Sequence, residues 1–312
     1  MLKGFPLIAT FVLIGFSAST VVMLFETKGR ADSTMVVKQE SYWPMPPDGL
    51  RVPTPRGMTI TANGEYMVLD NAGRVLVFDE SGTLVRQWWM PEYSVGKPEG
   101  ICLLKDGRIA VADTHYHRVV LFSHDGDVVG MFGKMGTEPG EFIYPVSVIQ
   151  DDKENLYVCE YGNYNDRVQK FRPDGTFVAQ IGSYGTDDGQ FQRPSGAVWF
   201  EGLIYVVDAF NNRIQVFEEE GKLVAILGSS DKISDLYYPY DIAISEQGEL
   251  YVVEYGGGRV SKLDRSGKLL GRFGHPGSGT GEFKTPWGIA VDRRGRVYVC
   301  DTGNHRIVEL QL

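Results

Sequence analysis

Residues 281–310 read GEFKTPWGIAVDRRGRVYVCDTGNHRIVEL, and they contain three short apolar runs separated by two polar connections. The first two runs are Gly288–Asp292 (GIAVD) and Arg296–Cys300 (RVYVC), and we interpret both as alternating strand sequences. A turn that ends at Gly295 joins these two runs. The third run, Arg306–Leu310, follows a Gly-Asn-His loop. Alternation over runs of this length predicts three short antiparallel strands.

The same arrangement occurs six times along the chain. Each unit has Pro-x-Gly or a near match, two apolar strands of which the second ends in Asp or Glu, and an arginine that begins the third strand. The prolines recur 43 to 49 residues apart, at Pro55, Pro98, Pro145, Pro194, Pro239 and Pro286. Five units add a fourth apolar run, at 84–89, 128–133, 177–182, 223–228 and 269–274. A repeat of this size with only strands in it predicts the blades of a six-bladed β-propeller.

The last unit lacks a fourth strand because the chain stops at Leu312. A spare apolar segment, Met35–Trp43, precedes the first Pro-x-Gly and has no unit of its own. Pairing of this segment with the last blade would close the ring and remove two free sheet edges. We therefore expect one propeller domain over residues 31–312, closed by a strand at 35–43.

The connections between blades carry a second motif. Gly-x-Phe precedes the repeat proline at Phe142, Phe191 and Phe283, and Leu236 takes the place of the phenylalanine before Pro239. The series G-x-F-x-x-P, G-x-A-V-D and Y-V-x-D-x-x-N-x-R-I resembles the NHL-repeat family over nearly all of the chain after Trp43. This resemblance implies an all-β, six-bladed propeller. The family includes enzymes, RNA-binding domains and protein-interaction platforms, so the fold alone leaves the function open.

The amino-terminal segment is of a different kind. Phe5–Phe25 holds 21 residues without a charge, and as a helix it would span about 31 Å, enough for a hydrocarbon core of about 30 Å. We expect residues 1–30 to be a signal anchor with a short linker; the alternative is a signal peptide cleaved near Ser17-Ala18-Ser19. Either interpretation places the propeller outside the cytoplasm, in the periplasm or the extracellular space, because the short amino-terminal tail normally stays inside.

The charge balance disfavours nucleic acid as a partner. The chain has 31 Lys and Arg against 40 Asp and Glu, a formal net charge of −9, which opposes attraction to phosphate backbones. We expect no binding of DNA or RNA.

A feature that recurs in every unit is expected to serve the blade. The carboxylate that ends the second strand and the arginine that begins the third are therefore interpreted as structural, with bonds that hold the loop between them. These pairs are Asp70 with Arg74, Asp113 with Arg118, Glu160 with Arg167, Asp208 with Arg213, Glu254 with Arg259, and Asp301 with Arg306. Cys159 and Cys300 occupy apolar core positions of the second strand, and we expect buried thiols there, without a disulfide or a metal.

Functional residues are expected where a unit departs from the repeat. Antiparallel order brings Pro-x-Gly and the loop before each arginine to the same rim, and aromatic residues collect at both places. The candidates for a binding rim are Tyr144, Tyr238, Tyr240, Asp241, Trp287, Arg56, Glu99, His115, His117 and His305. Neighbouring loops add Tyr161, Tyr164, Phe210 and Tyr255. An aromatic rim with few charges is typical of a protein-binding surface, and the alternative is packing of the same rings between blades.

Two enzyme classes with this architecture are the alternatives to a binding module. Amidating lyases hold zinc with three axial histidines, but the histidines of this chain belong to separate blades or loops. Lactonase-type propellers hold calcium with axial carboxylates and asparagines; Glu99 and Asp241 could begin such a site, yet no axial asparagine accompanies them. We therefore expect no catalytic residues and no cofactor. The expected function is a membrane-tethered scaffold for a protein or peptide partner, such as a membrane or envelope protein.

Overall fold

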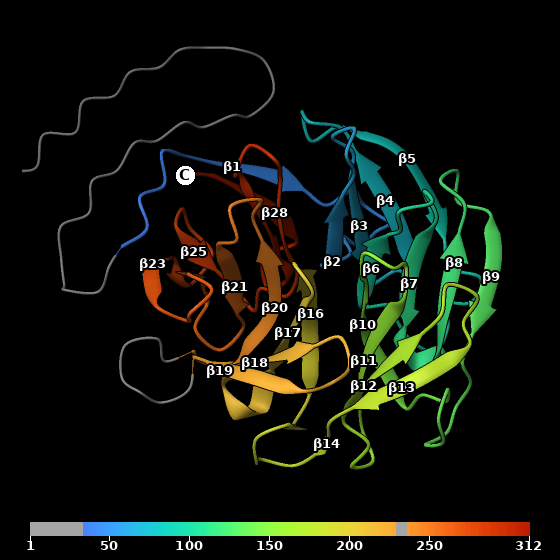
Figure 1. Cartoon of the computed structure of the whole chain (residues 1–312). Helices are drawn as coiled ribbons and strands as arrows, with labels where there is room; N and C mark the ends of the chain where they lie inside the picture. The colour runs from blue at the N-terminus through green and yellow to red at the C-terminus, as the bar shows by residue number, and fades with distance from the viewer. Residues whose placement is uncertain (1–33, 229–235) are drawn as a thin grey trace, which may run out of the picture.

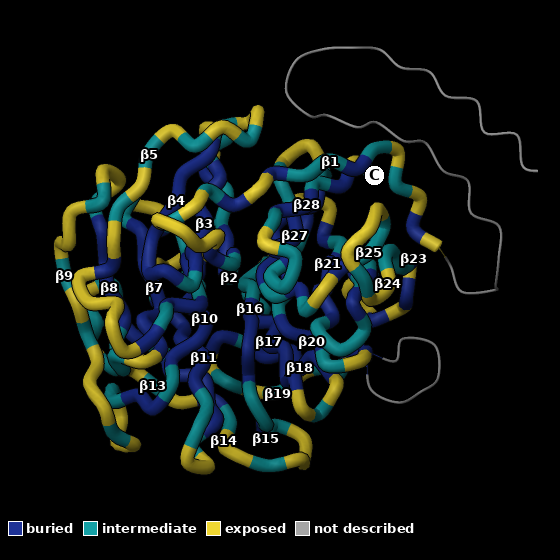
Figure 2. The backbone as a smooth tube through the Cα atoms, turned by 180° about the vertical axis from the view of Figure 1, so that it is seen from behind, coloured by how far each residue is buried: buried dark blue, intermediate teal, exposed yellow. Residues whose placement is uncertain are grey.

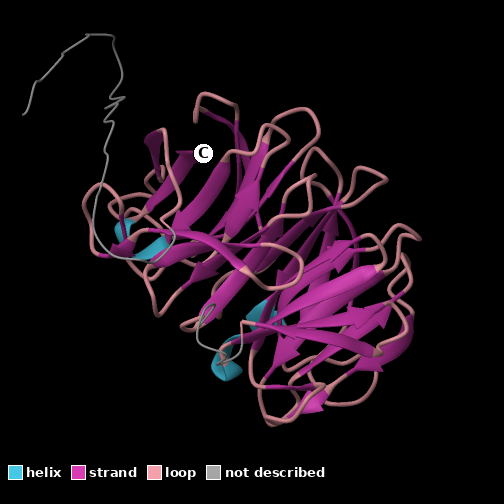
Figure 3. Cartoon of the chain, turned by 60° about the vertical axis from the view of Figure 1, so that its left-hand side comes forward, coloured by secondary structure: helices cyan, strands magenta, loops and turns pink. Residues whose placement is uncertain are grey.

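The computed structural model describes residues 34–228 and 236–312, and these residues form six four-stranded antiparallel sheets arranged around one axis (Figure 1). The expectation of an all-β, six-bladed propeller is confirmed. Strands account for almost all of the regular structure, and three one-turn 3₁₀ helices lie in the loops between second and third strands (Figure 3). Within the described ranges no helix has the length and apolar character needed to cross a membrane. The segment Phe5–Phe25 lies outside them.

Each blade runs from an inner strand at the axis to an outer strand at the periphery. Blade 1 comprises β2 (Pro55–Ile60), β3 (Tyr66–Asp70), β4 (Arg74–Phe78) and β5 (Leu84–Trp89). Blade 2 comprises β6 (Gly100–Leu103), β7 (Ile109–Asp113), β8 (Arg118–Phe122) and β9 (Val128–Phe132). Blade 3 comprises β10 (Tyr144–Gln150), β11 (Leu156–Tyr161), β12 (Arg167–Phe171) and β13 (Phe177–Ile181).

Blades 4 to 6 follow the same order. Blade 4 comprises β16 (Pro194–Phe200), β17 (Leu203–Asp208), β18 (Arg213–Glu218) and β19 (Leu223–Leu227). Blade 5 comprises β20 (Pro239–Ile244), β21 (Leu250–Glu254), β22 (Arg259–Leu263) and β23 (Leu269–Phe273). Blade 6 comprises β26 (Ile289–Val291), β27 (Val297–Asp301), β28 (Arg306–Gln311) and, as its outer strand, β1 (Gln39–Pro44).

The first and the last described strands pair in blade 6. β1 pairs with β28 in antiparallel register from Gln39 opposite Gln311 to Pro44 opposite Arg306. The pairing begins four residues later than the segment expected from the sequence, because the chain first contacts blade 5, where Met35 N donates to the carbonyl of Arg272 (2.8 Å). The outer edge of the last blade is thereby covered by the amino-terminal strand.

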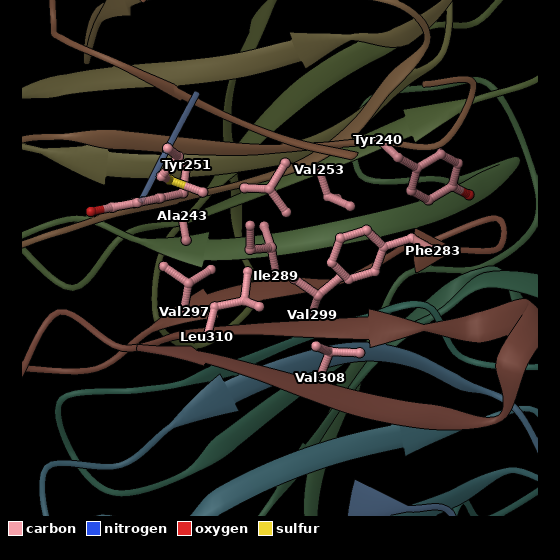
Figure 4. Packing of buried hydrophobic residues seen from close by; sticks show 12 residues of the cluster. Tyr240, Ala243, Tyr251, Val253, Phe283, Ile289, Val297, Val299, Val308 and Leu310 are labelled. Atoms are coloured by element: carbon pink, nitrogen blue, oxygen red, sulfur yellow. The ribbon is translucent and has the colours of Figure 1, made fainter. Parts of the chain in front are cut away.

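Burial follows the position of a strand in its blade. The second strands are buried almost throughout, whereas outer strands such as β5 alternate between half-buried and exposed residues (Figure 2). Apolar side chains of adjacent blades form the core, as Val253 of blade 5 and Val299 of blade 6 do in Figure 4. Each fully buried Val or Leu contributes about 1.5–3 kcal/mol. The Gly-x-Phe motif also contributes to this core. Its phenylalanines are fully buried between blades: Phe142, Phe191 and Phe283.

Candidate functional site

The repeated carboxylates and arginines hold loops. In blade 1 the Asp70 carboxylate accepts hydrogen bonds from Ala72 N (2.9 Å), Arg74 N (3.0 Å) and Arg74 Nε (2.7 Å). The corresponding arginine Nε to carboxylate distances in the other blades are 2.9 Å for Arg118, 2.7 Å for Arg167, 2.8 Å for Arg213, 3.0 Å for Arg259 and 2.7 Å for Arg306. With these charges paired inside the blades, the remaining polar groups near the axis are the candidates for a functional site.

Glycines allow the inner strands to come close together at the axis. A Cβ atom on Gly57 would overlap the carbonyl oxygen of Glu99, and one on Gly288 would overlap that of Arg56. Asp241 stands where most units have this glycine. Its Oδ1 fits because Gly196 of the preceding blade's inner strand has no side chain; a Cβ on Gly196 would lie 2.5 Å from this oxygen. A departure from the repeat thus places a carboxylate on the axis.

Asp241 is held by backbone donors only. Its Oδ1 accepts from Ile242 N (2.9 Å) and its Oδ2 from Ile289 N (3.1 Å). Among the residues that the structure describes, no Lys, Arg or His forms an ion pair with it. Burial raises the pKa of Asp241 to about 7, and the two backbone bonds oppose the shift. The carboxylate lines an axial cavity of about 90 Å³, together with Ser147 and Ser195.

A flat stack of three side chains lies beside this cavity. The Arg56 guanidinium is 4.0 Å from the centre of the Trp287 ring, and the Trp287 ring stacks on Tyr240 at 5.0 Å with an angle of 11° between the planes. Each member comes from the x position of a Pro-x-Gly motif in blades 1, 6 and 5. Tyr240 is only 5% exposed, so it packs between blades rather than forming an open surface, in agreement with the packing alternative for this ring.

A chain of hydrogen bonds links the stack to a second arginine. Arg193 Nη2 donates to Tyr240 Oη (2.9 Å), Tyr240 Oη donates to Glu99 Oε2 (3.0 Å), and Arg56 Nη1 donates to Glu99 Oε1 (3.0 Å). Burial raises the pKa of Tyr240 well above that of a free tyrosine, so the hydroxyl stays protonated and can donate. Both oxygens of Glu99 are therefore engaged by groups of the protein itself.

Exposed and partly exposed rings extend from this network over blades 2 to 5. His115 and Tyr144 lie 5.5 Å apart, and Tyr144 and Tyr161 lie 5.4 Å apart. On the other side of Arg193, Phe210 is 5.4 Å from Tyr238, and Tyr238 is 5.0 Å from Tyr255. We call these six side chains the aromatic arc: His115, Tyr144, Tyr161, Phe210, Tyr238 and Tyr255. Arg193 joins its two halves, with its guanidinium 4.3 Å from the Tyr161 ring and 5.8 Å from the Phe210 ring.

The structure brings most of the candidates together. Arg56, Glu99, Tyr240, Asp241 and Trp287 surround the cavity, and Tyr144, Tyr238 and His115 belong to the aromatic arc. His117 sits next to this arc, since its ring is 5.9 Å from Tyr144 and its Nδ1 contacts the carbonyl of Ile143. His305 lies apart, at the boundary of blades 6 and 1, where Nδ1 is 2.7 Å from the carbonyl of Val52.

Arg193 is the residue that the sequence analysis missed. It immediately precedes Pro194, in the position that Tyr144 and Tyr238 occupy before their own prolines, so a comparison of all six residues at this position would have included it. Its backbone has φ of 60°, and Asp166 Oδ1 accepts a hydrogen bond from its N–H (2.6 Å).

The axial residues do not fit the metal sites of the two enzyme classes considered above. Glu99 is occupied by Arg56 and Tyr240, and Asp241 by two backbone N–H groups. Residues 34–228 and 236–312 contain no group of three or more His, Cys, Asp or Glu side chains placed to hold a metal ion. All three cysteines are free thiols, and Cys159 and Cys300 are buried.

Comparison with known proteins identifies the repeat. The family model described as NHL repeat matches residues 96–122 and 283–310. The propeller carries NHL repeats. No curated protein sequence matches the chain significantly.

Solved structures similar to this NHL-repeat propeller include enzymes. A streptogramin B lyase has a TM-score of 0.64 at 15% identity, with 88% of this chain and 97% of the lyase covered. Virginiamycin B lyase from Staphylococcus aureus has 0.63 at 14%, with 88% and 99% covered. A gluconolactonase from Xanthomonas campestris has 0.66 at 16%, with 88% and 89% covered. At these identities the similarity establishes the fold alone.

Proposed function

We propose that this protein binds a protein or peptide partner through the aromatic arc. The observation that carries the proposal is the run of rings from His115 to Tyr255, exposed at His115 and Phe210 and partly exposed at the four tyrosines, which spans four blades at one end of the propeller and surrounds Arg193. Aromatic residues and arginine are enriched in the parts of interfaces that contribute most binding energy. The rigid propeller beneath holds these rings in place, so little conformational entropy is lost on binding.

The similarity to lyases and to a gluconolactonase does not favour a metal-dependent enzyme for this chain. Zinc or calcium at the axis would require ligands that are free to coordinate, whereas the carboxylates of Glu99 and Asp241 already accept hydrogen bonds from the protein. Elemental analysis of protein purified without chelator should give much less than one zinc or calcium per chain. A stoichiometric metal ion would revive the enzyme alternative.

We also propose that the segment Phe5–Phe25 tethers the propeller to a membrane, with the domain on the extracytoplasmic side and the partner in the membrane or envelope. Its 21 uncharged residues support a spanning helix. The full-length chain should resist alkaline extraction from membranes, and protease should reach the propeller from outside the cytoplasm. Complete release by alkali would exclude the anchor, and protection from protease would exclude the orientation.

A matched pair of variants tests the binding surface. Phe210 of the aromatic arc is 55% exposed, and Val129 on the outer strand β9 is 54% exposed. Peptides are first selected against the full-length wild type from a random library. Phe210→Ala should weaken the selected peptides by about 1–3 kcal/mol because it removes an interface ring. Val129→Ala should leave affinity unchanged, and neither variant should lose much stability. Equal affinities of wild type and both variants would refute the aromatic arc as the binding surface.

A further inference from the structure

Arg193 differs from the other arginines near the axis in its lack of an ionic partner. Each repeat arginine is paired with its carboxylate, and Arg56 is paired with Glu99 at 3.0 Å. In the part of the chain that the structure describes, no carboxylate lies within 4.0 Å of the guanidinium of Arg193. The carboxylate of Asp166 is not bonded to this guanidinium. It accepts hydrogen bonds from the backbone N–H of Arg193 (2.6 Å) and from that of Gly162 (3.3 Å).

The side chain of Arg193 has no directly bonded carboxylate in this network. Glu99 accepts from the side chain of Arg56, whereas Asp166, although close enough to interact electrostatically with Arg193, accepts from its backbone N–H. Tyr240 stays neutral and takes only one hydrogen bond from Nη2 of Arg193. Because Glu99 is fully engaged, no acceptor within this network is left for the second arginine. A guanidinium that is partly removed from water without a carboxylate bonded to it keeps unused donors, and an anionic ligand could take them.

The guanidinium of Arg193 keeps unused hydrogen-bonding capacity. Among the described residues its Nε is buried without a partner and its Nη2 donates to Tyr240, so a ligand would meet this partly exposed side chain at its terminal nitrogens. The rings of Tyr161, at 4.3 Å, and Tyr240, at 5.4 Å, lie against the guanidinium. A planar guanidinium whose faces contact rings offers its N–H edge, and that edge matches the two oxygens of a carboxylate.

The surroundings of the guanidinium favour an apolar group next to the charge. Phe210, which is largely exposed, lies 5.8 Å from the guanidinium and 5.4 Å from Tyr238. An apolar side chain of a ligand could lie on Phe210 while its carboxylate meets Arg193. The carboxyl-terminal residue of a peptide has both groups on one carbon atom.

We propose that Arg193 is the anchor for a ligand carboxylate, supplied by the carboxyl terminus of a peptide whose last side chain is apolar. This inference rests on the proposed function and adds the chemical class of the ligand. Arg193 would bind the carboxylate through its N–H edge, and Phe210 with Tyr238 would contact the terminal side chain. The local charge gives specificity, because the chain as a whole has a net charge of −9 and repels anions at long range.

Three short peptides separate the possible sources of the carboxylate. The probes are N-acetyl-Ala-Ala-Phe with a free carboxylate, the same peptide as its amide, and N-acetyl-Ala-Glu-Phe amide, each titrated calorimetrically against the full-length chain. The free acid should bind about 10- to 100-fold more tightly than its amide, since charged hydrogen bonds are lost with the amide. Tight binding of the glutamate peptide amide would keep Arg193 as a carboxylate site but overturn the assignment to a peptide terminus.

Variants connect the effect to Arg193. R193Q should remove the preference for the acid, and R193K, which keeps the charge and lacks the planar fork, should reduce it by about tenfold or more. Arg172 is exposed in the turn between β12 and β13, at the opposite end of the propeller, and R172Q should bind as the wild type does. Thermal melts identify a variant that has lost its fold, in which case R193K supplies the comparison.

The outcomes also separate this inference from the proposed function. If the acid and its amide bind equally well and F210A weakens both, the carboxylate site is refuted while the aromatic arc remains the binding surface. If R172Q reduces the preference for the free acid over the amide as much as R193Q does, the preference reflects the overall charge of the protein. This result would also refute the carboxylate site at Arg193. If no probe binds although the library selection succeeds, only the carboxylate inference is overturned.

Discussion

Replacement of Trp43 by alanine should lower the free energy of unfolding by about 3–5 kcal/mol. Trp43 lies in β1, is 5% exposed, and packs in the cluster between blade 6 and blade 1. Its ring meets Tyr66 edge-on at 5.0 Å and lies 5.3 Å from Tyr298 and 6.1 Å from Phe78. The estimate combines the lost transfer energy with the cavity left where three aromatic rings lose a neighbour.

A second tryptophan provides the control for this prediction. Trp89 is in the outer strand β5, is 39% exposed and contacts Tyr93 at 4.8 Å, so Trp89→Ala should cost no more than about 1.5 kcal/mol. Urea denaturation followed by far-ultraviolet circular dichroism measures both, because the change in this signal on unfolding comes mainly from the loss of the β-sheets and the midpoint is read from each variant's own baselines. Equal losses for the two variants, or a loss below about 1 kcal/mol for Trp43→Ala, would refute the assignment of β1 as the strand that stabilises the closed ring.

Three further predictions concern the ring, the axis and the thiols. Deletion through Pro44 should lower the melting temperature more than deletion through Ser33, since only the longer deletion uncovers the edge of β28; equal temperatures would contradict ring closure. Burial raises the pKa of Asp241 to about 7, so between about pH 4 and pH 7 the folded state holds a proton that the unfolded state has released. The stability of the wild type relative to Asp241→Asn should therefore fall as pH rises through this window and level off above it, and a rise would contradict the buried carboxylate. Burial raises the pKa of Cys102 to about 12 and that of the other two cysteines above the ordinary thiol value. A thiol reagent at pH 8 should therefore react slowly with the native protein, whereas all three thiols should react after denaturation. Rapid reaction of the native protein would contradict the burial of the thiols, because it requires an accessible thiolate.

The fold could be predicted because its determinants are local and repeated. Gly-x-Phe predicts a buried ring at the three connections that contain it, and Phe142, Phe191 and Phe283 are fully buried there. The exact start of β1 could not be predicted in the same way. It depends on a contact of Met35 with Arg272 in another blade, and no periodicity within the segment itself encodes that contact.

The candidate site was only partly predictable for a related reason. Departures from the repeat located Asp241 because a side chain at a glycine position must enter the axis. The burial of Tyr240 depends on stacking with Trp287 of the next blade, and the surroundings of Arg193 depend on Tyr161 of the preceding blade. Such contacts arise from the relative placement of blades, which a single sequence does not specify.

The pairing of β1 with β28 sets the order in which the molecule can be completed. Lys38 Nζ donates to the carbonyl of Leu312 across a separation of 274 residues, so the first described strand to leave the ribosome pairs with the last. Blades 1 to 5 can form from consecutive sequence during synthesis, but the sixth blade cannot be completed until β28 has left the ribosome. We expect ring closure to be the slow, final step of folding, because contacts of such long sequence separation form slowly. Until then the edge of the last blade stays open to other chains, and interrupted synthesis would yield an unclosed, aggregation-prone product.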